Sequence, residues 1–471
     1  MSIDTTIDTT VDTTIDTTAD PAVDAAVRAR PEQGRLVRPS DPDWDLARGT
    51  FNVLDDQRPE AIAFPTDATE VAAAVSWARE RGCRVAAQAT GHNATALGSL
   101  EGTVIVNTSA LTGVEIDAEA RRVRVGAATR WEAVTPRLSE LGLAGLHGSS
   151  PDVGIVGYSL LGGIGWLARK HGMQANAVTA IELVTADGRL VRTDADHEPE
   201  LFWALRGGGG NYGVVTAVEF EVQPVRELYA GAMFFPVDRI VEVLHAWTAM
   251  LPSLPDEMTT WASVIHFPPF PEVPDVVRGQ SFIIVLVAFL GDEPEGSELL
   301  RPVRDLGPVM DTLAMSEPIA LATQAMDPDR PLPFRSTTAL LDELTPEAIE
   351  EVARVAGPGS ALTLVEFRHI GGALRRTVPG AGARATLPGN IAFLSLGVVP
   401  DPALDPVVQD GLRVLTETVA PRKVGDYPNF VMAPTDASDF FDADTWDRLR
   451  RVKAAYDPEN VFRGNHQVPP A

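Results

Sequence analysis

Three glycine-rich stretches in the first half of the chain constrain its fold more than any other feature. The first is Gly91-His92-Asn93, the second runs over residues 161–166 as Leu-Gly-Gly-Ile-Gly-Trp, and the third covers residues 207–213. Glycine adopts positive φ and lets other groups come close to the backbone, so each stretch marks a place where main chain can lie against a ligand. Because one stretch also carries a histidine, the set predicts a bound dinucleotide and a side chain that can bond to it.

Predicted strands and a helix alternate just before the first glycine stretch. Residues 61–64 predict a strand that Pro65 ends, and residues 67–82 predict a helix with an Asp or Thr cap and an acid in its first turn. Residues 84–87 predict a second strand, which leads straight into the histidine loop. A strand–helix–strand unit that delivers a glycine loop is an α/β arrangement suited to holding phosphates.

More strands are predicted in the first half, and the composition and hydrophobic pattern of the sequence change after Pro224. Residues 131–141 predict a helix, and residues 446–453 predict another near the end of the chain. Proline-rich loops and long alternating strands follow Pro224, so a domain boundary near residue 225 fits the pattern. The other expected strands are 103–107, 122–126, 179–185, 189–192, 214–222, 281–289 and 392–399.

Length and charge limit the classes of protein to which this chain can belong. A chain of 471 residues with 45% hydrophobic residues is expected to form two domains with sizeable cores. The formal net charge of -26 argues against nucleic acid and anionic membranes as partners, although solubility alone explains it. Residues 1–35 contain repeated Ile/Val-Asp-Thr-Thr units, which predict a disordered tail because so few short units cannot build a β-solenoid.

Cysteine content and hydropathy narrow the class further. Cys83 is the only cysteine, which rules out an intrachain disulfide and a cysteine cluster for zinc or iron–sulfur, and we expect no metal site. No signal peptide is visible and no apolar run is long enough to span a bilayer, so we expect a soluble, cytoplasmic protein. The oligomeric state stays open, with a homo-oligomer as one possibility.

Six signatures, in order along the chain, resemble those of one family of flavoproteins. Any one of them alone is weak, but their shared order makes coincidence improbable. They are Gly91-His92, residues 151–154 (Pro-Asp-Val-Gly), residues 162–172, residues 200–209, residues 427–430 (Tyr-Pro-Asn-Phe) and residues 456–465. From about Pro42 to Pro470 the chain resembles the vanillyl-alcohol oxidase / p-cresol methylhydroxylase (PCMH) superfamily, in its berberine-bridge-enzyme-like branch and of the bacterial 6-hydroxy-D-nicotine oxidase type.

The resemblance implies an α+β protein with a two-domain PCMH-type FAD-binding fold and an antiparallel-sheet substrate domain. The FAD-binding domain is expected over residues 36–225 and the substrate-binding domain over residues 226–434. Residues 435–471 are expected to return to the FAD domain.

The resemblance also implies FAD, held by one covalent bond between its 8α carbon and His92. The alternative is a loop histidine hydrogen-bonded to backbone, the commoner fate of a lone histidine. A second link through cysteine, found in many relatives, is excluded because Ser150 stands at that position. The residues expected to contact FAD are Ala87, Gln88, Ala89, Thr90, Gly91, His92, Asn93, Ser150, Pro151, Val153, Gly154, Gly157, Gly162, Gly163, Gly165, Trp166, Val215, Tyr427, Asn429 and Asn465.

The glycines are expected to have separate roles. The loop 87–93 should wrap the pyrophosphate with backbone N–H groups, because it contains no Lys or Arg. Gly162, Gly163 and Gly165 should bring backbone donors against the isoalloxazine edge, where charge develops near N1. The same triad is compatible with a Rossmann site, but the acid expected about 20 residues on has no clear counterpart. Residues 207–213 could instead form a tight surface turn.

Two residues are candidates for acid–base chemistry. Tyr427 matches the family position that takes a hydroxyl proton while hydride leaves for the flavin, and its pKa of about 10 must fall for that role. A core aromatic with a satisfied hydroxyl is the alternative. Glu366 is the second candidate, in a strand where Glu366 and Arg368 face one side and Phe367 and His369 the other. We expect Phe367, Arg368 and His369 to line the substrate pocket, with an exposed Glu366–Arg368 pair as the simpler alternative.

Val153 bears on the choice of electron acceptor. In this family a small β-branched residue before the glycine of the Pro-x-x-Gly segment leaves room for oxygen above the flavin C4a atom. Val153 is small, so we expect an oxidase that moves hydride from an alcohol or amine carbon of a small molecule to FAD, with O2 as acceptor and H2O2 as product. A flavin dehydrogenase with another acceptor, and a flavin-containing binding or resistance protein, remain alternatives.

Overall fold

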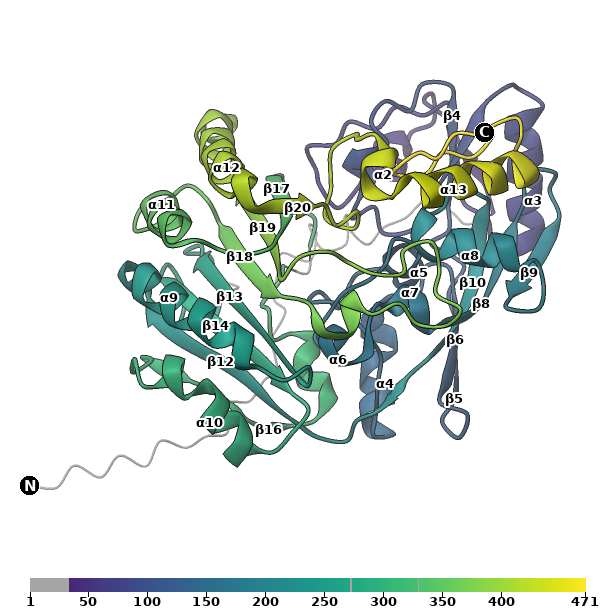
Figure 1. Cartoon of the computed structure of the whole chain (residues 1–471). Helices are drawn as coiled ribbons and strands as arrows, with labels where there is room; N and C mark the ends of the chain where they lie inside the picture. Colours follow the sequence, from purple (N-terminus) through teal and green to yellow (C-terminus); the bar gives the residue numbers. More distant parts are fainter. Residues whose placement is uncertain (1–33, 272, 329) are drawn as a thin grey trace, which may run out of the picture.

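The computed structural model describes residues 34–471 except residues 272 and 329. The predicted tail of residues 1–35 lies outside the described residues, apart from its last two positions. In the described part, strands form four sheets, and the larger ones lie in two halves of the molecule side by side (Figure 1). Mixed helices and largely antiparallel sheets confirm the α+β fold class.

The first sheet places the histidine loop. Its strands run in the order β1 (Leu36–Val37), β2 (Ala61–Ala63), β4 (Thr103–Asn107) and β3 (Arg84–Gln88). β2, β4 and β3 are parallel, and helix α3 (Ala68–Arg79) connects β2 to β3 as the sequence predicts. Asp67 caps α3 by accepting a hydrogen bond from the N–H of Glu70. The loop after β3 therefore leaves the carboxyl edge of a parallel sheet, where α/β folds bind ligands.

The second sheet is antiparallel and shares its core with the helices that border the other glycine stretches. Its order is β5 (Val114–Asp117), β6 (Arg122–Gly126), β10 (Val214–Glu221), β8 (Val178–Val184) and β9 (Leu190–Asp194). Helices α5 (Ile155–Leu160) and α8 (Pro199–Gly208) pack against it. The expected helix over residues 131–141 is instead a 3-10 turn at Trp131–Ala133 and helix α4 (Thr135–Glu140), because Pro136 has no N–H and begins a new helix.

A nine-stranded antiparallel sheet forms the other half. Along its main path the order is β15, β12, β14, β13, β18, β19, β17 and β20, and β16 also pairs with β12. The strands are β12 (Leu228–Pro236), β13 (Met258–His266), β14 (Ser281–Phe289), β15 (Met310–Asp311), β16 (Ala314–Ser316), β17 (Phe334–Leu341), β18 (Leu364–His369), β19 (Ile391–Val398) and β20 (Lys423–Gly425).

One face of the nine-stranded sheet is covered by helices and the other faces the first half of the molecule. The covering helices are α9 (Ile240–Met250), α10 (Glu293–Arg304), α11 (Pro346–Ala356) and α12 (Asp405–Val419) (Figure 1). Trp261 on the opposite face joins a core that includes Trp166 and Leu167, which follow the second glycine stretch. Side chains therefore alternate along each strand between a helix-covered core and the junction of the two halves.

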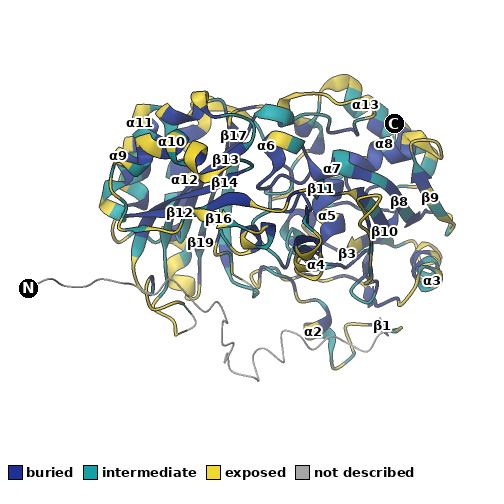
Figure 2. Ribbon diagram, turned by 90° about the horizontal axis from the view of Figure 1, so that it is seen from below, coloured by how far each residue is buried: buried dark blue, intermediate teal, exposed yellow. Residues whose placement is uncertain are grey.

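The end of the chain returns to the first half. Helix α13 (Ala443–Tyr456) packs on α8, and Phe462 forms a parallel bridge with Val85 of β3. The central strands, such as β10, β13 and β14, are largely buried, while the outer helices carry exposed residues on their solvent side (Figure 2). No helix in the described part of the chain is long and apolar enough to cross a membrane. The domain boundaries at residues 36, 225 and 434 stay predictions.

Candidate active site

His92 is held from two sides at the loop after β3. The Phe51 ring stacks on the imidazole, with centroids 3.9 Å apart and planes at 25°. On the other side, His92 Nε2 lies 3.2 Å from Asp152 Oδ2, close enough for an ion pair but not aligned for a hydrogen bond. Gly91 has a φ of 77°, and a Cβ there would lie 3.3 Å from Thr50 Cα. Glycine therefore makes room for the segment that carries Phe51.

Asp152 is a buried carboxylate that remains charged. Its side chain is 8% exposed, and its Oδ1 accepts a hydrogen bond of 2.6 Å from the Ser150 hydroxyl. Burial by itself raises the pKa of Asp152, but His92, the Ser150 hydroxyl and Arg130 favour the anion and bring that pKa below its usual range. The Ser150 hydroxyl thus supports the Asp152 carboxylate.

Several predicted contact residues have buried polar atoms without a partner. Gln88 Oε1, Asn93 Oδ1 and Asn429 Oδ1 have no hydrogen-bond partner among the described residues. A buried polar atom left unpaired costs about 1–3 kcal/mol, so such a cluster points to a polar ligand. A phosphate- and amide-rich cofactor such as FAD fits these unpaired groups and the imidazole beside them.

Hydrogen bonds bring three distant segments together around Asn93. Its Nδ2 donates to the backbone carbonyls of Pro428, Asn429 and Val431 at 3.2–3.3 Å. Asn465 Nδ2 in turn donates to the Asn93 carbonyl at 2.5 Å. The histidine loop, the Tyr-Pro-Asn-Phe segment and the end of the chain therefore meet at one place. The Pro-Asp-Val-Gly segment joins them, since a Cβ on Gly154 would lie 3.7 Å from Thr90.

Glycines of the second stretch pack against neighbouring protein atoms, whereas the sequence predicts that they lie against the cofactor. A Cβ on Gly163 would lie 2.6 Å from the Tyr158 ring, and one on Gly165 would overlap the His147 carbonyl oxygen. These two glycines are therefore required by neighbouring protein atoms. Gly162 lies beside Tyr427, whereas Gly157 of α5 is exposed and a Cβ there would meet no atom within 4 Å. No neighbouring protein atom requires glycine at position 157.

The third glycine stretch is buried, so the surface-turn alternative is wrong. A Cβ on Gly207 would overlap the backbone of Arg384, and one on Gly213 would lie 2.6 Å from the Val184 carbonyl oxygen. Two other expected FAD contacts are also occupied by protein. Val215 lies in the core of the second sheet, and Trp166 stacks on Trp261 with centroids 3.6 Å apart. The structure does not support a cofactor contact for these side chains.

Tyr427 is buried with a satisfied hydroxyl. Its oxygen accepts a hydrogen bond of 2.8 Å from the backbone N–H of Ile164, at the second glycine stretch. Burial raises the pKa of Tyr427 well above its ordinary value, although that hydrogen bond and the nearby Arg368 and Arg384 act in the opposite direction. The lowered pKa expected for a general base is therefore absent, because desolvation outweighs the two guanidinium groups.

Glu366 and Arg368 form a buried pair at the junction, so the exposed-pair alternative is wrong. Arg368 Nε donates to Glu366 Oε1 at 2.5 Å, and the Ser263 hydroxyl donates to Glu366 Oε2 at 2.9 Å. The Arg368 guanidinium also donates to the Ser149 hydroxyl at 3.1 Å and lies 3.9 Å above the Trp261 ring. The pair therefore faces the segment that precedes Ser150 and Asp152.

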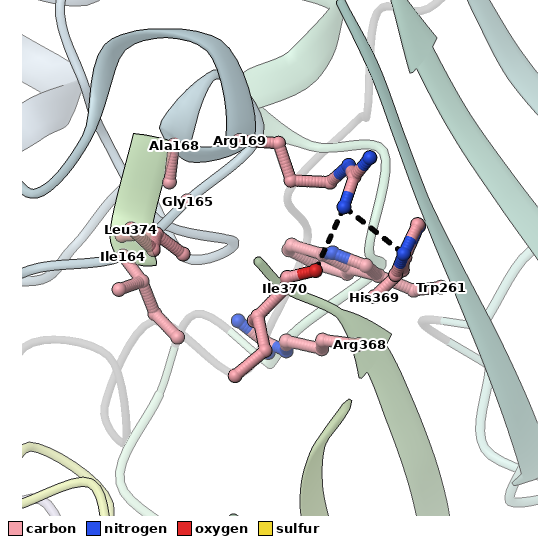
Figure 3. A pocket seen from close by; sticks show the side chains of 9 residues that line it. All are labelled: Ile164, Gly165, Ala168, Arg169, Trp261, Arg368, His369, Ile370 and Leu374. Carbon is pink, nitrogen blue, oxygen red and sulfur yellow. Dashed lines mark hydrogen bonds between the residues drawn. The ribbon is translucent and has the colours of Figure 1, made fainter. Parts of the chain in front are cut away.

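A small cavity of about 10 Å³ lies between the second glycine stretch and β18 (Figure 3). Arg169 of helix α6 (Ala168–His171) reaches across it and donates to the Ile370 carbonyl at 2.7 Å and to His369 Nε2 at 2.9 Å. The same guanidinium donates to the carbonyls of Met258, Leu254 and Pro255. The side chains and backbone that line the cavity are Ile164, Gly165, Ala168, Arg169, Trp261, Arg368, His369, Ile370 and Leu374.

Only two of the three residues expected in the substrate pocket line this cavity. Arg368 and His369 line the cavity, but His369 already accepts a hydrogen bond from Arg169, and burial lowers the pKa of His369 to about 3. Phe367 does not reach the pocket. Its ring is fully buried under the helices and stacks on Phe393 at 5.4 Å, because strand alternation sends it to the opposite face of the sheet.

Sequence reasoning missed four side chains that shape the site. Phe51 and Trp261 lie outside the six signatures and gave no local signal. Asp152 and Arg169 lie inside two of those signatures. Charged residues are seldom buried without a partner, so a charged residue in each signature could have been recognised as part of the site. Their partners come from distant segments, which periodicity does not reveal.

Comparisons with known proteins agree with this geometry. Residues 59–194 match the FAD binding domain family, and residues 435–469 match the berberine and berberine-like family. The chain is 28% identical to (R)-6-hydroxynicotine oxidase of Paenarthrobacter nicotinovorans, over 93% of this chain and 97% of that protein. It is 26% identical to xylooligosaccharide oxidase of Thermothelomyces thermophilus, over 91% of each.

A solved structure shares the fold over the same length. The crystal structure of 6-hydroxy-D-nicotine oxidase from Arthrobacter nicotinovorans superposes with a TM-score of 0.80, at 24% identity, covering 93% of this chain and 98% of that one. The fold and the two family matches define this chain as an FAD-dependent oxidoreductase. Within that class, the end of the chain is similar to the berberine and berberine-like family, and the whole chain is similar to (R)-6-hydroxynicotine oxidase.

Proposed function

We propose that this enzyme is an oxidase that carries FAD on His92 through a single covalent bond. The observation that carries the proposal is the placement of His92, clamped between Phe51 and Asp152 beside unpaired buried polar atoms. Ser150 replaces the cysteine of doubly linked relatives and directs its hydroxyl to Asp152. The attachment is therefore monocovalent, and the loop 87–93 with Asn429 and Asn465 holds the rest of the cofactor.

The substrate is a small organic molecule with an oxidisable alcohol or amine carbon, and O2 is the electron acceptor. FAD, when bound, supplies the acceptor for a hydride and passes its electrons to O2 to give H2O2. The oxidase relatives, named for a hydroxynicotine and a xylooligosaccharide, support an oxidase that acts on a small molecule. Val153, which is small and partly buried in the Pro-Asp-Val-Gly segment, supports oxygen access.

The chain's own residues divide the work at the junction of the two halves. Arg368, stacked on Trp261 and paired with Glu366, orients the substrate, and Glu366 takes the proton from the substrate hydroxyl or amine. Tyr427, whose pKa is raised, keeps its proton and fixes the second glycine stretch through Ile164. The closely packed Trp166–Trp261 pair excludes water from one wall.

Two readings of one substrate screen test this function. Candidate alcohols and amines are mixed with the enzyme without oxygen, and bleaching of the flavin absorbance identifies those that reduce it. The hits are then repeated in air with a peroxide assay. Bleaching followed by stoichiometric H2O2 is expected. Bleaching that persists in air would instead describe a dehydrogenase, and the absence of bleaching with any tightly bound compound would describe a binding protein.

A further inference from the structure

The two ring nitrogens of His92 have different surroundings. Nε2 lies 3.2 Å from the Asp152 carboxylate, whose other oxygen is held by Ser150 at 2.6 Å. A carboxylate beside one imidazole nitrogen favours the proton on that nitrogen, because an anion attracts an N–H and repels a lone pair. The lone pair of the neutral ring is then left on Nδ1.

The orientation of the ring is restrained by a segment that spans both halves of the molecule. Phe51 stacks on the imidazole, and its neighbour Asn52 is fixed by two hydrogen bonds to Phe334 at the start of β17. The Thr50 hydroxyl closes the same turn by donating to the Asn52 carbonyl at 2.7 Å. Turning the imidazole over would place the Nδ1 edge against Asp152 and disturb a stacked pair held on both sides.

We propose that Asp152 is a positioning residue that selects the Nε2–H tautomer of His92, so that the covalent bond to the flavin 8α carbon forms through Nδ1. The inference rests on the proposed covalent attachment. It adds the group that controls which nitrogen of the ring reacts. The second contact of Asp152, with the Ser150 hydroxyl, holds the carboxylate in place beside Nε2.

The step balances with the groups named. A bond forms between His92 Nδ1 and the 8α carbon, and one C–H bond of that methyl group breaks. The methyl proton and the Nε2 proton both leave to solvent, and the Asp152 carboxylate stays charged beside the ring. The electron pair of the broken C–H bond stays on the isoalloxazine until O2 removes it as H2O2.

Three substitutions at Asp152 separate charge from hydrogen bonding. Asp152→Asn keeps the size and an acceptor oxygen but loses the charge that stabilises the alkylated imidazolium. Asp152→Leu removes both, and Asp152→Glu restores the charge on a longer arm. Asp196→Asn is the matched control, because Asp196 is exposed in the loop after β9.

The full-length chain is produced in a riboflavin-starved host and mixed with FAD, and acid-stable flavin is followed against time. The wild type and Asp196→Asn are expected to attach flavin at the same rate, through Nδ1 in the NMR spectrum of the isolated flavin peptide. Asp152→Asn should attach it at least about 10²-fold more slowly, through the same atom. Asp152→Leu should be slower still and lose the preference for Nδ1, and Asp152→Glu should restore part of the rate.

Non-covalent FAD binding and the melting temperature of each variant show whether it is folded. If Asp152→Leu does not fold, the inference is tested by the attachment rate of Asp152→Asn and by the linking nitrogen found in the wild type. Attachment through Nε2 in the wild type, or an Asp152→Asn rate equal to wild type, would overturn this inference while leaving covalent flavin in place. A wild-type protein with no acid-stable flavin would overturn the proposed attachment itself.

Discussion

Tyr427 and Glu366 are both buried, but protein contacts leave them in different chemical states. The Tyr427 hydroxyl is held by Ile164 and has a raised pKa, whereas Glu366 forms a buried ion pair with Arg368. Strand alternation in the sequence correctly placed Arg368 and Phe367 on opposite faces, but His369, expected on the face of Phe367, lines the cavity together with Arg368 at the end of β18. The sequence could not say which face meets the cofactor domain, because that depends on how two sheets pack.

We predict that Glu366→Gln lowers the anaerobic rate of flavin reduction by about 10²–10⁴-fold, the usual contribution of a positioned base. Tyr427→Phe keeps the ring packing and should reduce that rate by less than about tenfold, since it loses one hydrogen bond of roughly 1 kcal/mol. Stopped-flow reduction without oxygen measures both rates. Ser263→Ala, which removes only the other hydrogen bond to Glu366, is the control and should stay near wild type.

The opposite ranking would assign the base to the tyrosine. A Tyr427→Phe enzyme that is slowed by two orders of magnitude, beside a Glu366→Gln enzyme at the wild-type rate, would contradict the assignment of Glu366 as the base and Tyr427 as a packing residue.

Val153 leads to a prediction about the oxidative half-reaction alone. Replacing Val153 by Leu should slow reoxidation of the reduced flavin by O2, because the larger side chain narrows the approach to it. Anaerobic reduction by substrate should not change. Val153→Ala is the matched control and should react with O2 at least as fast as wild type. Stopped-flow mixing of reduced enzyme with O2 gives the rates, and equal rates for Val153→Leu and wild type would remove Val153 from the oxygen path.

At the scale of elements, local signals predicted much of the fold. The strands at residues 103–107, 122–126 and 281–289 and the capped helix α3 lie where the sequence places them. The prediction of one continuous helix over residues 131–141 was wrong because Pro136 begins a separate helix. The glycine stretches were recognised, but their packing against Tyr158, His147 and Arg384 could not be, since those contacts are set by tertiary structure.

Arg169 links helix α6 to the start of β13 and to the loops beside β13 and β18. Arg169 is buried and donates to the carbonyls of Met258, Leu254, Pro255 and Ile370. Arg169→Met should leave these carbonyls unpaired and lower the free energy of unfolding by about 3–5 kcal/mol. Its neighbour Lys170, which forms a half-exposed ion pair with Glu257, is the control, and Lys170→Met should cost less than about 1 kcal/mol.

Urea unfolding followed by tryptophan fluorescence measures both variants. Similar losses for the two would show that the Arg169 hydrogen bonds do not hold α6 to the sheet.

At the scale of the whole molecule, buried histidines tie stability to pH. Burial lowers the pKa of His147 to about 4 and that of His369 to about 3, whereas an unfolded histidine titrates near about 6.5. Between these values the unfolded chain binds more protons than the folded one. The free energy of unfolding should therefore be unaffected by these groups above pH of about 6.5 and should fall as the pH drops below it.

We predict that His147 alone contributes a loss of about 2–3 kcal/mol between pH of about 6.5 and 4. The measurement is the free energy of unfolding of wild type and His147→Gln across that pH range, with the difference between the two curves isolating the histidine. The difference should shrink as the pH falls, because the variant has no proton to gain. Parallel curves would contradict the assignment of a buried, neutral His147.

The central claim is that FAD is bonded covalently to His92, and acid precipitation tests it most directly. Purified wild-type protein and His92→Ala are denatured in acid, the pellets are washed, and the flavin in pellet and supernatant is quantified. The wild-type pellet should retain its yellow colour, and digestion should yield a flavin peptide that contains His92. His92→Ala should bind FAD through the remaining loop and asparagine contacts but release all of it into the supernatant. If the wild-type protein also releases all its flavin, the covalent account of this site is contradicted.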